Sequence, residues 1–368
     1  MTPALRSTAR TLALLACLPL AGCGMVVLDP SGDVAARQRD LLVISTLLML
    51  LIIVPVMALV VWFAWRYRHN NRDAAYEPDW HHSMRLELVI WSAPLLIIIC
   101  LGAITWLGTH LLDPYRKLDR LDKQRPLTTE TRELVVQVVA LDWKWLFIYP
   151  QYGVATVNEF VVPVDQPVSL RITASSVMNS FYVPEFAGMI YAMPGMQTQL
   201  HGVFNSVNDS EGFSANYSGA GFSGMKFAAR SVTQADFDAW IEKAKGSQET
   251  LTRQRYLQLA EPSEREPPRL FAKTDDRLFD YVLGNCVQPG RMCSHDMMAI
   301  DRRGGLGLAS IYNVVRGPNG AYLMGMCTLP EPTPLDDILR PANRAPLVGA
   351  GLRLPRSDLE TPLLAGAE

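Results

Sequence analysis

Two long apolar runs dominate the first third of the chain. Leu41–Trp65 and Leu88–Leu112 each hold 25 residues without a charged side chain. A helix needs roughly 20 apolar residues to cross the hydrocarbon core of a bilayer. Each run also contains a proline, Pro55 or Pro94, which spanning helices tolerate better than soluble ones. The pattern predicts two transmembrane helices, and a pair of buried core helices is the weaker alternative.

The hydrophobic pattern changes to a period of two after about residue 126. The stretches "ELVVQVVALDWKWLFIY", "VNEFVVPV" and "VSLRIT" are rich in β-branched and aromatic residues, and Gly and Pro separate them. Further short strands are expected near Phe181–Val183, Gln197–Leu200 and Lys226–Arg230. Many short strands with such turns predict an antiparallel sandwich or barrel.

One helix is expected to close this sandwich. In "TQADFDAWIEKAKG", Phe237, Trp240 and Ile241 fall on one helical face, and Gly246 is a candidate C-cap. The fold class expected from the whole pattern is membrane α + β. An N-terminal two-helix transmembrane hairpin precedes a β-sandwich and a short helical C-terminal arm.

Composition supports a membrane protein and excludes one class of partner. Of the 368 residues, 49% are hydrophobic and 19% charged, with a formal net charge of -2. The apolar excess fits membrane spans. A nucleic-acid binder would need a basic tract that neutralises phosphates, and the sequence has none, so no nucleic-acid partner is expected.

The N-terminus has the features of a bacterial lipoprotein signal peptide. Arg6 and Arg10 precede a short apolar run that ends in "LAGC" at Cys23. We expect Cys23 to become the acylated mature N-terminus on the outer face of the inner membrane, anchored in membrane lipid. An uncleaved signal anchor with an ordinary buried Cys is the alternative.

Basic residues flank both sides of the second span, so charge alone leaves the orientation open. An external Cys23 places the chain from Leu127 onward in the periplasm.

The order of these features carries a resemblance to a known family. A lipobox, two spans and a β-sandwich with "LDWKW" resemble subunit II of the haem–copper respiratory oxidases. The resemblance implies a cupredoxin-like sandwich. It runs through "LDWKWLFIYP", "SVMNSFYVPEF", "IYAMPGMQTQLH" and "SGAGFSGMKF" and covers about residues 15–285.

Members of this family that oxidise cytochrome c bind a dinuclear copper centre through Cys, His and Met side chains and a Glu carbonyl. In this sequence the corresponding positions hold mostly other residues. They are Asn179 at the first His, Ser214 and Ser218 at the two Cys, Asn216 at the Glu, Phe222 at the second His, and Met225 at the Met. Copper sites of this type select thiolate and imidazole ligands. We therefore expect no metal here, and within the family this loss resembles the quinol oxidases.

The resemblance implies the role of the chain and of its partners. It would be subunit II of a proton-pumping quinol oxidase that oxidises ubiquinol and reduces oxygen. The haems, copper and ubiquinol would be bound by the large subunit I, with smaller membrane subunits beside it, and this chain would bind no cofactor. Trp143 would pack against the large subunit. Two alternatives stay open: a cytochrome c oxidase subunit with copper bound elsewhere in the chain, and a periplasmic lipoprotein that binds a partner without redox chemistry.

Two further sites are expected outside the loop. Glu87 lies at the cytoplasmic end of the second span, where relatives carry a Glu at a proton entrance, so we expect it to take up protons. An ordinary boundary charge, paired with Arg85 or another arginine of the connector, is the alternative. Cys286 and Cys293 predict a local disulfide in an oxidising compartment, and a metal site that adds His295 is less favoured.

The expected segments are a signal peptide 1–22, a periplasmic N-terminal segment 23–40, transmembrane helix 41–65, a cytoplasmic connector 66–87, transmembrane helix 88–112, a periplasmic cupredoxin domain 127–246, a C-terminal arm and extension 247–326, and a flexible Pro-rich tail 327–368.

Overall fold

The computed structural model describes residues 26–302, apart from 72, 74–78, 80 and 129–130. The predicted signal peptide, the acylation of Cys23 and the Pro-rich tail lie outside the described residues.

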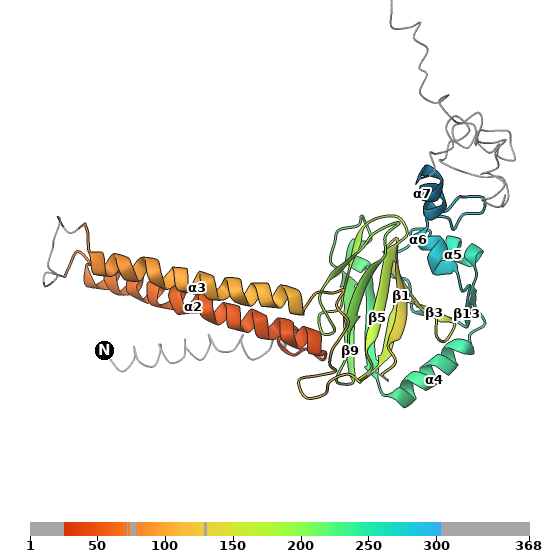
Figure 1. The fold of residues 1–368 in the computed structure, drawn as a ribbon, viewed down its shortest axis with the longest axis horizontal. Coiled ribbons are helices and arrows are strands. Elements are labelled where there is room, and N and C mark those ends of the chain that lie inside the picture. The colour runs from red at the N-terminus through yellow and green to blue at the C-terminus, as the bar shows by residue number, and fades with distance from the viewer. Residues whose placement is uncertain (1–25, 72, 74–78, 80, 129–130, 303–368) are drawn as a thin grey trace, which may run out of the picture.

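Two long helices form the N-terminal part and run side by side away from the rest of the molecule (Figure 1). A short 3-10 turn, η2 (Val26–Leu28), precedes α2 (Asp33–Arg66), and α3 (Met84–Leu111) returns antiparallel to it. Both are long and apolar enough to cross a membrane. Helix α2 begins before the apolar run at Leu41, because the polar segment from Asp33 to Asp40 continues the same helix.

Two β-sheets face each other in the central domain, as expected for a cupredoxin-like sandwich. The first has the order β12-β3-β2-β1-β5-β8 and the second β4-β10-β9-β6-β7. Their strands are β1 (Leu134–Leu141), β2 (Lys144–Tyr149), β3 (Val154–Val157), β4 (Glu159–Pro163), β5 (Val168–Ala174), β6 (Asn179–Tyr182), β7 (Ile190–Ala192), β8 (Thr198–Gly202), β9 (Asn208–Ser214), β10 (Lys226–Val232) and β12 (Arg269–Phe271). A separate ribbon pairs β11 (Thr250–Leu251) with β13 (Lys273–Thr274).

The sandwich is mixed, which corrects the expectation of a wholly antiparallel one. Strand β1 pairs in parallel with β5, and β10 pairs in parallel with β4. The two strands of each parallel pair are not consecutive in the sequence. Strands β2 to β4 lie between β1 and β5, and strands β5 to β9 lie between β4 and β10. Alternating hydrophobicity reports which face of a strand is buried, and it carries no information on the direction of the neighbouring strand.

An aromatic cluster fills the space between the two sheets. Trp145 and Phe147 from β2 meet Phe160, Phe181 and Phe227 from the second sheet. Their rings pack with centroid distances from 5.1 Å, between Phe147 and Phe227, to 6.3 Å, between Phe147 and Phe181. Such contacts add to the stabilisation that comes from burying apolar area.

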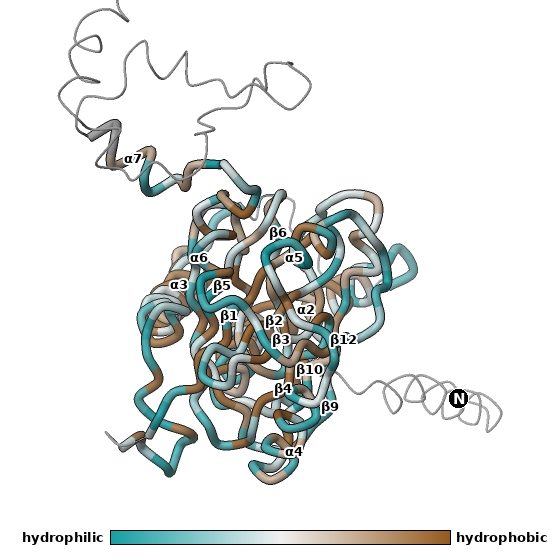
Figure 2. The backbone as a smooth tube through the Cα atoms, turned by 90° about the vertical axis from the view of Figure 1, so that its right-hand side faces the viewer, coloured by the Kyte–Doolittle hydropathy of each residue, from teal (hydrophilic) through white to brown (hydrophobic). Residues whose placement is uncertain are grey.

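The C-terminal arm covers the outer face of the first sheet. It follows α4 (Gln234–Lys245) and contains α5 (Arg253–Leu259) and α6 (Leu278–Leu283), which pack on this face, and then α7 (Ser294–Arg302). A second core unites Leu146 and Ile148 of β2 with arm residues such as Tyr256 and Phe279. Strand β2 is therefore buried on both faces. Across the domain, apolar positions concentrate in the strands, whereas the loops are hydrophilic (Figure 2).

The predicted closing helix α4 is confirmed. Phe237, Trp240 and Ile241 are buried, and Gly246 is the C-cap residue. The helix begins after Thr233, whose side chain accepts a hydrogen bond from the backbone N–H of Asp236 at 3.2 Å. This N-cap satisfies one of the free N–H groups of the first turn.

Candidate functional site

The structure brings the first copper-site positions together at one end of the sandwich. Asn179 begins β6 and Ser214 ends β9, and both side chains are buried. The Ser214 hydroxyl lies 3.1 Å from Asn179 Oδ1 and 3.2 Å from the backbone carbonyl of Asn216, and can donate to either. The Ser180 N–H donates to the same hydroxyl at 3.4 Å. These polar groups therefore satisfy one another without an ion.

The remaining positions lie in the loop between β9 and β10. The Ser218 hydroxyl lies 4.0 Å from the thioether sulfur of Met225, which is fully buried immediately before β10. The ring of Phe222 packs edge-on against that of Tyr217, with 5.6 Å between their centroids. Phe222 has no lone pair, so its side chain could not act as a metal ligand.

Trp143 holds the loop in place. It is one of the two residues between β1 and β2 and has a φ of 63°, which permits this tight turn. Its indole N–H donates to the Ser218 carbonyl at 3.1 Å. A Cβ atom at Gly221 would lie 2.4 Å from Trp143 Cδ2, so only glycine allows this approach. The shape of the loop is thus set by packing on Trp143.

At the far end of the helical pair, Glu87 lies in the first turn of α3. Its Oε1 is 2.6 Å from His82 Nδ1, and the side chains of Glu87 and His82 are 43% and 56% exposed. The structure pairs the carboxylate with His82, which corrects the alternative of a pair with Arg85 or another arginine of the connector. Spacing alone could not show this partner, because His82 belongs to the connector before the helix.

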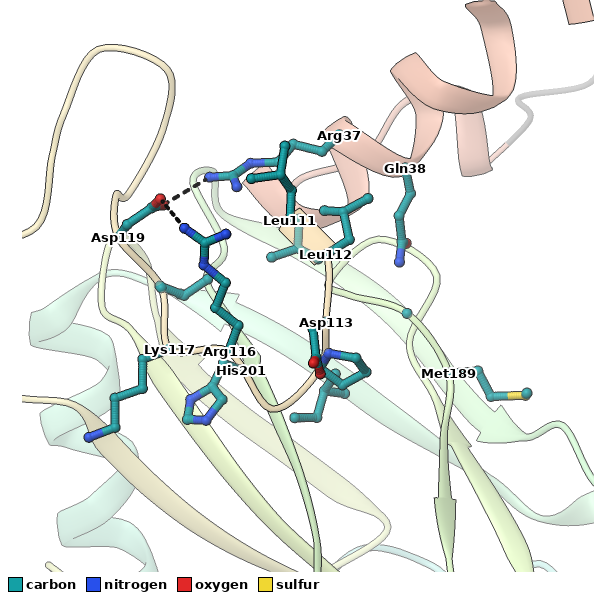
Figure 3. Close-up of a pocket in the computed structure, with 15 residues that line it drawn as sticks. Arg37, Gln38, Leu111, Leu112, Asp113, Arg116, Lys117, Asp119, Met189 and His201 are labelled. Atoms are coloured by element: carbon teal, nitrogen blue, oxygen red, sulfur yellow. Dashed lines mark hydrogen bonds and ion pairs between the residues drawn. The ribbon is translucent and has the colours of Figure 1, made fainter. Parts of the chain in front are cut away.

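The other end of the pair carries a charge network that the sequence reasoning missed. The Asp33 side chain is only 4% exposed, and its carboxylate lies 2.6 Å from Arg37 and 3.2 Å from Arg120. Asp119 accepts from Arg37 at 3.5 Å and from Arg116 at 3.3 Å (Figure 3). The sequence did contain a hint of this network: Asp33 precedes the first apolar run, and Arg116 and Arg120 follow the second.

A cavity of about 150 Å³ lies beside this network. It is bounded by the start of α2, the end of α3, the following linker and the sandwich. His201 of β8 lines it, with its side chain 2% exposed and its Nδ1 2.8 Å from Glu133 Oε1. This hydrogen bond from His201 lowers the pKa of the Glu133 carboxyl.

Comparison with known proteins shows close relatives over most of the chain. It is 47% identical to the cytochrome bo(3) ubiquinol oxidase subunit 2 of Pseudomonas putida over 272 residues, 74% of this chain and 84% of that protein. It is 46% identical to the ubiquinol oxidase subunit 2 of Acetobacter aceti over 279 residues, 76% of this chain and 88% of that one. The chain belongs to the subunit II family of the quinol oxidases.

Two further comparisons concern parts of this quinol oxidase subunit. The family model named COX Aromatic Rich Motif matches residues 245–290, the arm that covers the first sheet. The sandwich is similar to the periplasmic domain of subunit II of the cytochrome oxidase of Bradyrhizobium japonicum, at 25% identity and a TM-score of 0.30. That match covers 30% of this chain and 93% of the other.

Membership of the family confirms the resemblance drawn from the sequence. The relatives are oxidase subunits, so the chain is part of an oxidoreductase complex and associates with other oxidase subunits.

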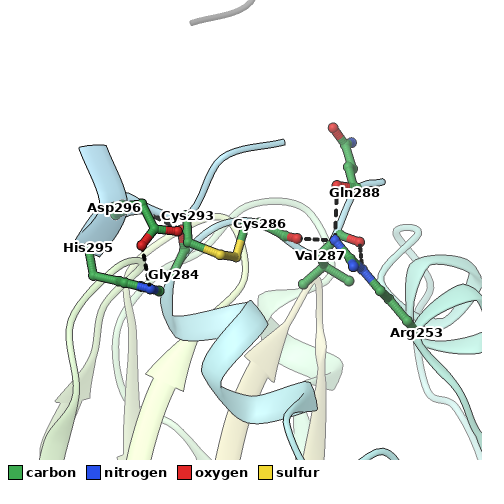
Figure 4. Close-up of a disulfide and its surroundings, with 9 residues drawn as sticks. Arg253, Gly284, Cys286, Val287, Gln288, Cys293, His295 and Asp296 are labelled. Atoms are coloured by element: carbon green, nitrogen blue, oxygen red, sulfur yellow. Dashed lines mark hydrogen bonds and ion pairs between the residues drawn. A yellow bond between two sulfur atoms is a disulfide. The ribbon is translucent and has the colours of Figure 1, made fainter. Parts of the chain in front are cut away.

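Beyond the sandwich, Cys286 and Cys293 form a disulfide in the structure, with 4.7 Å between their Cα atoms (Figure 4). The guanidinium of Arg253 donates to the carbonyls of Cys286, Val287 and Gln288 and so holds the same turn.

One side-chain group near this disulfide has the geometry of a metal site. The ligand atoms of Cys293, His295 and Asp296 lie within 4.8 Å of one another. His295 Nε2 is 3.1 Å from Asp296 Oδ1, and the Cys293 sulfur is bonded to Cys286. A sulfur in a disulfide is no thiolate, so this group lacks the ligand that would make it selective for a soft metal.

Proposed function

We propose that this chain is the copper-free subunit II of a proton-pumping ubiquinol:oxygen oxidoreductase. The complex would oxidise ubiquinol, reduce oxygen to water and move protons outward across the bacterial inner membrane. The names of the relatives support ubiquinol as the electron donor. The main domain would lie in the periplasm, beside a large subunit that binds the haems, copper and ubiquinol.

The hydrogen-bonded loop carries this proposal. Asn179, Ser214 and the Asn216 carbonyl occupy ligand positions and pair with one another, and Phe222 offers no donor atom. A dinuclear copper centre needs thiolates and imidazoles, so these residues do not fit it. A soluble electron donor requires a relay at the protein surface, whereas a quinol dissolved in the bilayer reaches the large subunit directly. A subunit without the relay is therefore compatible with quinol oxidation.

The alternatives have less support. A cytochrome c oxidase with copper elsewhere would need a second ligand set, and within the described part of the chain the candidate group at Cys293 has its sulfur in a disulfide. A periplasmic lipoprotein without redox partners would not explain a match to ubiquinol oxidase subunits across most of the chain. Haem that co-purifies with this chain from membranes would distinguish the oxidase from the free lipoprotein.

Glu87 is proposed as a proton entrance of the complex. Oxygen reduction consumes protons, which must reach a site buried in the membrane. A carboxylate in the first turn of α3, nearly half exposed and paired with His82, can exchange protons with the aqueous phase and pass them inward. His82 would hold the carboxylate in position at the membrane surface.

Lipid attachment at Cys23 is proposed from "LAGC" at the end of a short apolar run. Intact-mass analysis of the purified chain should show residues 1–22 removed and the mass of acyl chains added. A chain that retains those residues, or that lacks lipid mass, would refute this assignment.

Copper content tests the central proposal. In the purified complex we expect a copper-to-iron ratio that the metals of the large subunit account for in full, with no copper contributed by this chain. The quadruple variant Asn179→His, Ser214→Cys, Ser218→Cys, Phe222→His should raise the ratio and add an intense visible band, because thiolates then bridge a copper pair on a preorganised scaffold. The matched control changes only Asn179→His and Phe222→His and should add neither. Extra copper in the unmodified complex would overturn the proposal.

A further inference from the structure

The cavity beside α2 lies at the depth of lipid headgroups. Arg37, which lines it, precedes the apolar run at Leu41 by four residues, or about 6 Å along the helix axis. Leu111 and Leu112, at the end of the other run, line the same cavity. The headgroup region extends roughly 5–8 Å beyond each side of the hydrocarbon core. When the two apolar runs span the bilayer, the cavity therefore faces the phosphate layer.

The cavity walls are partly apolar and come from distant parts of the chain. Val34 of α2 and Leu200 of β8 contribute side chains, together with the end of α3. A Cβ atom at Gly188 would lie only 2.6 Å from Nε2 at the end of the flexible Gln38 side chain, so the sandwich and α2 lie close together here. The volume of about 150 Å³ accommodates a phosphate group, since one water needs about 10–15 Å³ by a similar measure.

Nitrogen atoms without partners gather at this cavity. Nε of Arg37 and Nε2 of His201 are buried and have no hydrogen-bond partner. Lys117 also lines the cavity. Its exposed side chain forms no ion pair among the described residues, although its charge helps to lower the pKa of the Glu133 carboxyl. Arg116 bonds Asp119 through one nitrogen, which leaves its other N–H groups available. Buried polar atoms without partners are uncommon in folded proteins and indicate a missing ligand or water.

Of the two acidic residues at the cavity, Asp119 is already paired with cations. It accepts from Arg37 and Arg116, whereas Asp113 accepts from the backbone N–H of Tyr115 at 2.9 Å and forms no ion pair within the described residues. The cavity thus offers several unused donors, together with apolar walls continuous with the membrane helices. A phosphate diester whose hydrocarbon chains lie along α2 and α3 matches this combination.

We propose that this cavity binds the phosphate group of a membrane phospholipid. Lys117 and Arg116 donate to the phosphate oxygens, and the acyl chains extend along the apolar surfaces of α2 and α3. The bound lipid then links the helical pair to the sandwich at the membrane surface. This site is independent of copper and of quinol turnover.

Photo-crosslinking in the complete purified oxidase, depleted of lipid, tests the proposal. The probe is dioleoyl phosphatidylglycerol with a diazirine on its headgroup, and crosslinks are mapped by peptide mass spectrometry. We expect saturable labelling of the linker at residues 113–119. An analogue with a neutral ether in place of the phosphate diester should not saturate this peptide. Equal labelling by the two probes would overturn phosphate recognition.

Variants of one exposed lysine complete the test. Lys117→Ala should raise the half-saturating concentration of the probe on the order of tenfold, because a charge-assisted hydrogen bond is lost. Lys117→Glu should raise it further, and Lys117→Arg should retain binding. The matched control is Lys243→Ala, an exposed lysine on α4, which should bind as the unmodified oxidase does. Unchanged binding in both Lys117→Ala and Lys117→Glu would refute the site.

A free anion is the other source of the same chemistry. Inorganic phosphate should not protect the linker peptide at concentrations comparable to those of the lipid, because it lacks the acyl chains that pack on the helices. Protection by inorganic phosphate at such concentrations would assign the cavity to a free anion and overturn the lipid assignment.

Discussion

The two ends of the helical pair treat charge in opposite ways. Where α2 begins, Asp33 is buried and shared between Arg37 and Arg120. Where α3 begins, Glu87 has His82 as its side-chain partner, and both side chains are about half exposed. Removal of one member of a buried pair leaves an uncompensated charge and is strongly destabilising, whereas an exposed pair contributes little. The first end is built to hold geometry, and the second leaves a carboxylate open to water.

The largest effect is expected from Asp33→Ala. It should reduce the free energy of unfolding by about 3–5 kcal/mol, because two guanidinium groups lose their buried partner. Denaturant unfolding of the full chain in detergent, followed by tryptophan fluorescence, measures the change. The matched control is Asp40→Ala on the same helix, whose more exposed carboxylate pairs with Arg39 and Lys123 and should cost less than about 1 kcal/mol. Equal losses in the two variants would contradict the assigned difference in burial.

The second effect should appear in turnover and not in stability. Glu87→Gln should slow quinol oxidation by the assembled complex by about tenfold or more, because the amide cannot carry a proton. Haem content should stay unchanged, and the stability loss should be below about 1 kcal/mol. Glu87→Asp should slow turnover less.

A variant at His82 separates proton uptake by Glu87 from the contact between the two side chains. His82→Gln removes the partner of Glu87 and keeps the carboxylate, so turnover should remain well above that of Glu87→Gln. If Glu87→Gln turned over at the unmodified rate, the carboxylate would have no proton role.

The smallest effect concerns pH and the His201–Glu133 pair. The hydrogen bond from His201 lowers the pKa of Glu133 below its ordinary 4.5. A carboxyl with a lowered folded-state pKa stabilises the protein fully above the unfolded value, and the stabilisation is lost as pH falls through the folded value. We therefore expect part of the thermal stability to disappear below about pH 4.5, by less than about 1 kcal/mol because the Glu133 side chain is 29% exposed.

Thermal unfolding of Glu133→Gln as a function of pH checks this expectation. The variant should lose this part of the acid sensitivity. Glu211→Gln, which alters an exposed pair with Lys226, should retain it. An unchanged pH profile in Glu133→Gln would exclude this pair as the source.

Local patterns predicted the elements well. The apolar runs predicted both long helices, and the face shared by Phe237, Trp240 and Ile241 predicted α4. The loop positions could be assigned because "SANYSGAGFSGM" keeps the ligand spacing that the family resemblance implies, and the structure does bring Asn179 beside Ser214. These predictions needed only information that is local along the chain.

What the sequence did not reveal depends on long-range packing. The parallel pairing of β1 with β5 and of β10 with β4 involves strands separated by other elements. The ion pair between Asp33 and Arg120 joins residues 87 positions apart, and His201 meets Glu133 across 68. No periodicity encodes such partners, so the cavity between α2 and the sandwich could not be foreseen.

The hydrogen bonds of the loop also bear on how copper ligands could be introduced into it by substitution. Because the Ser214 hydroxyl is tied to Asn179 and to the Asn216 carbonyl, a change at one position removes a partner from the others. A first Cys or His would weaken this loop before any metal could be gained, since the copper pair needs several ligands at once. Copper binding would therefore have to be introduced by several substitutions made together, because each single substitution in the loop would cost stability and add no metal affinity.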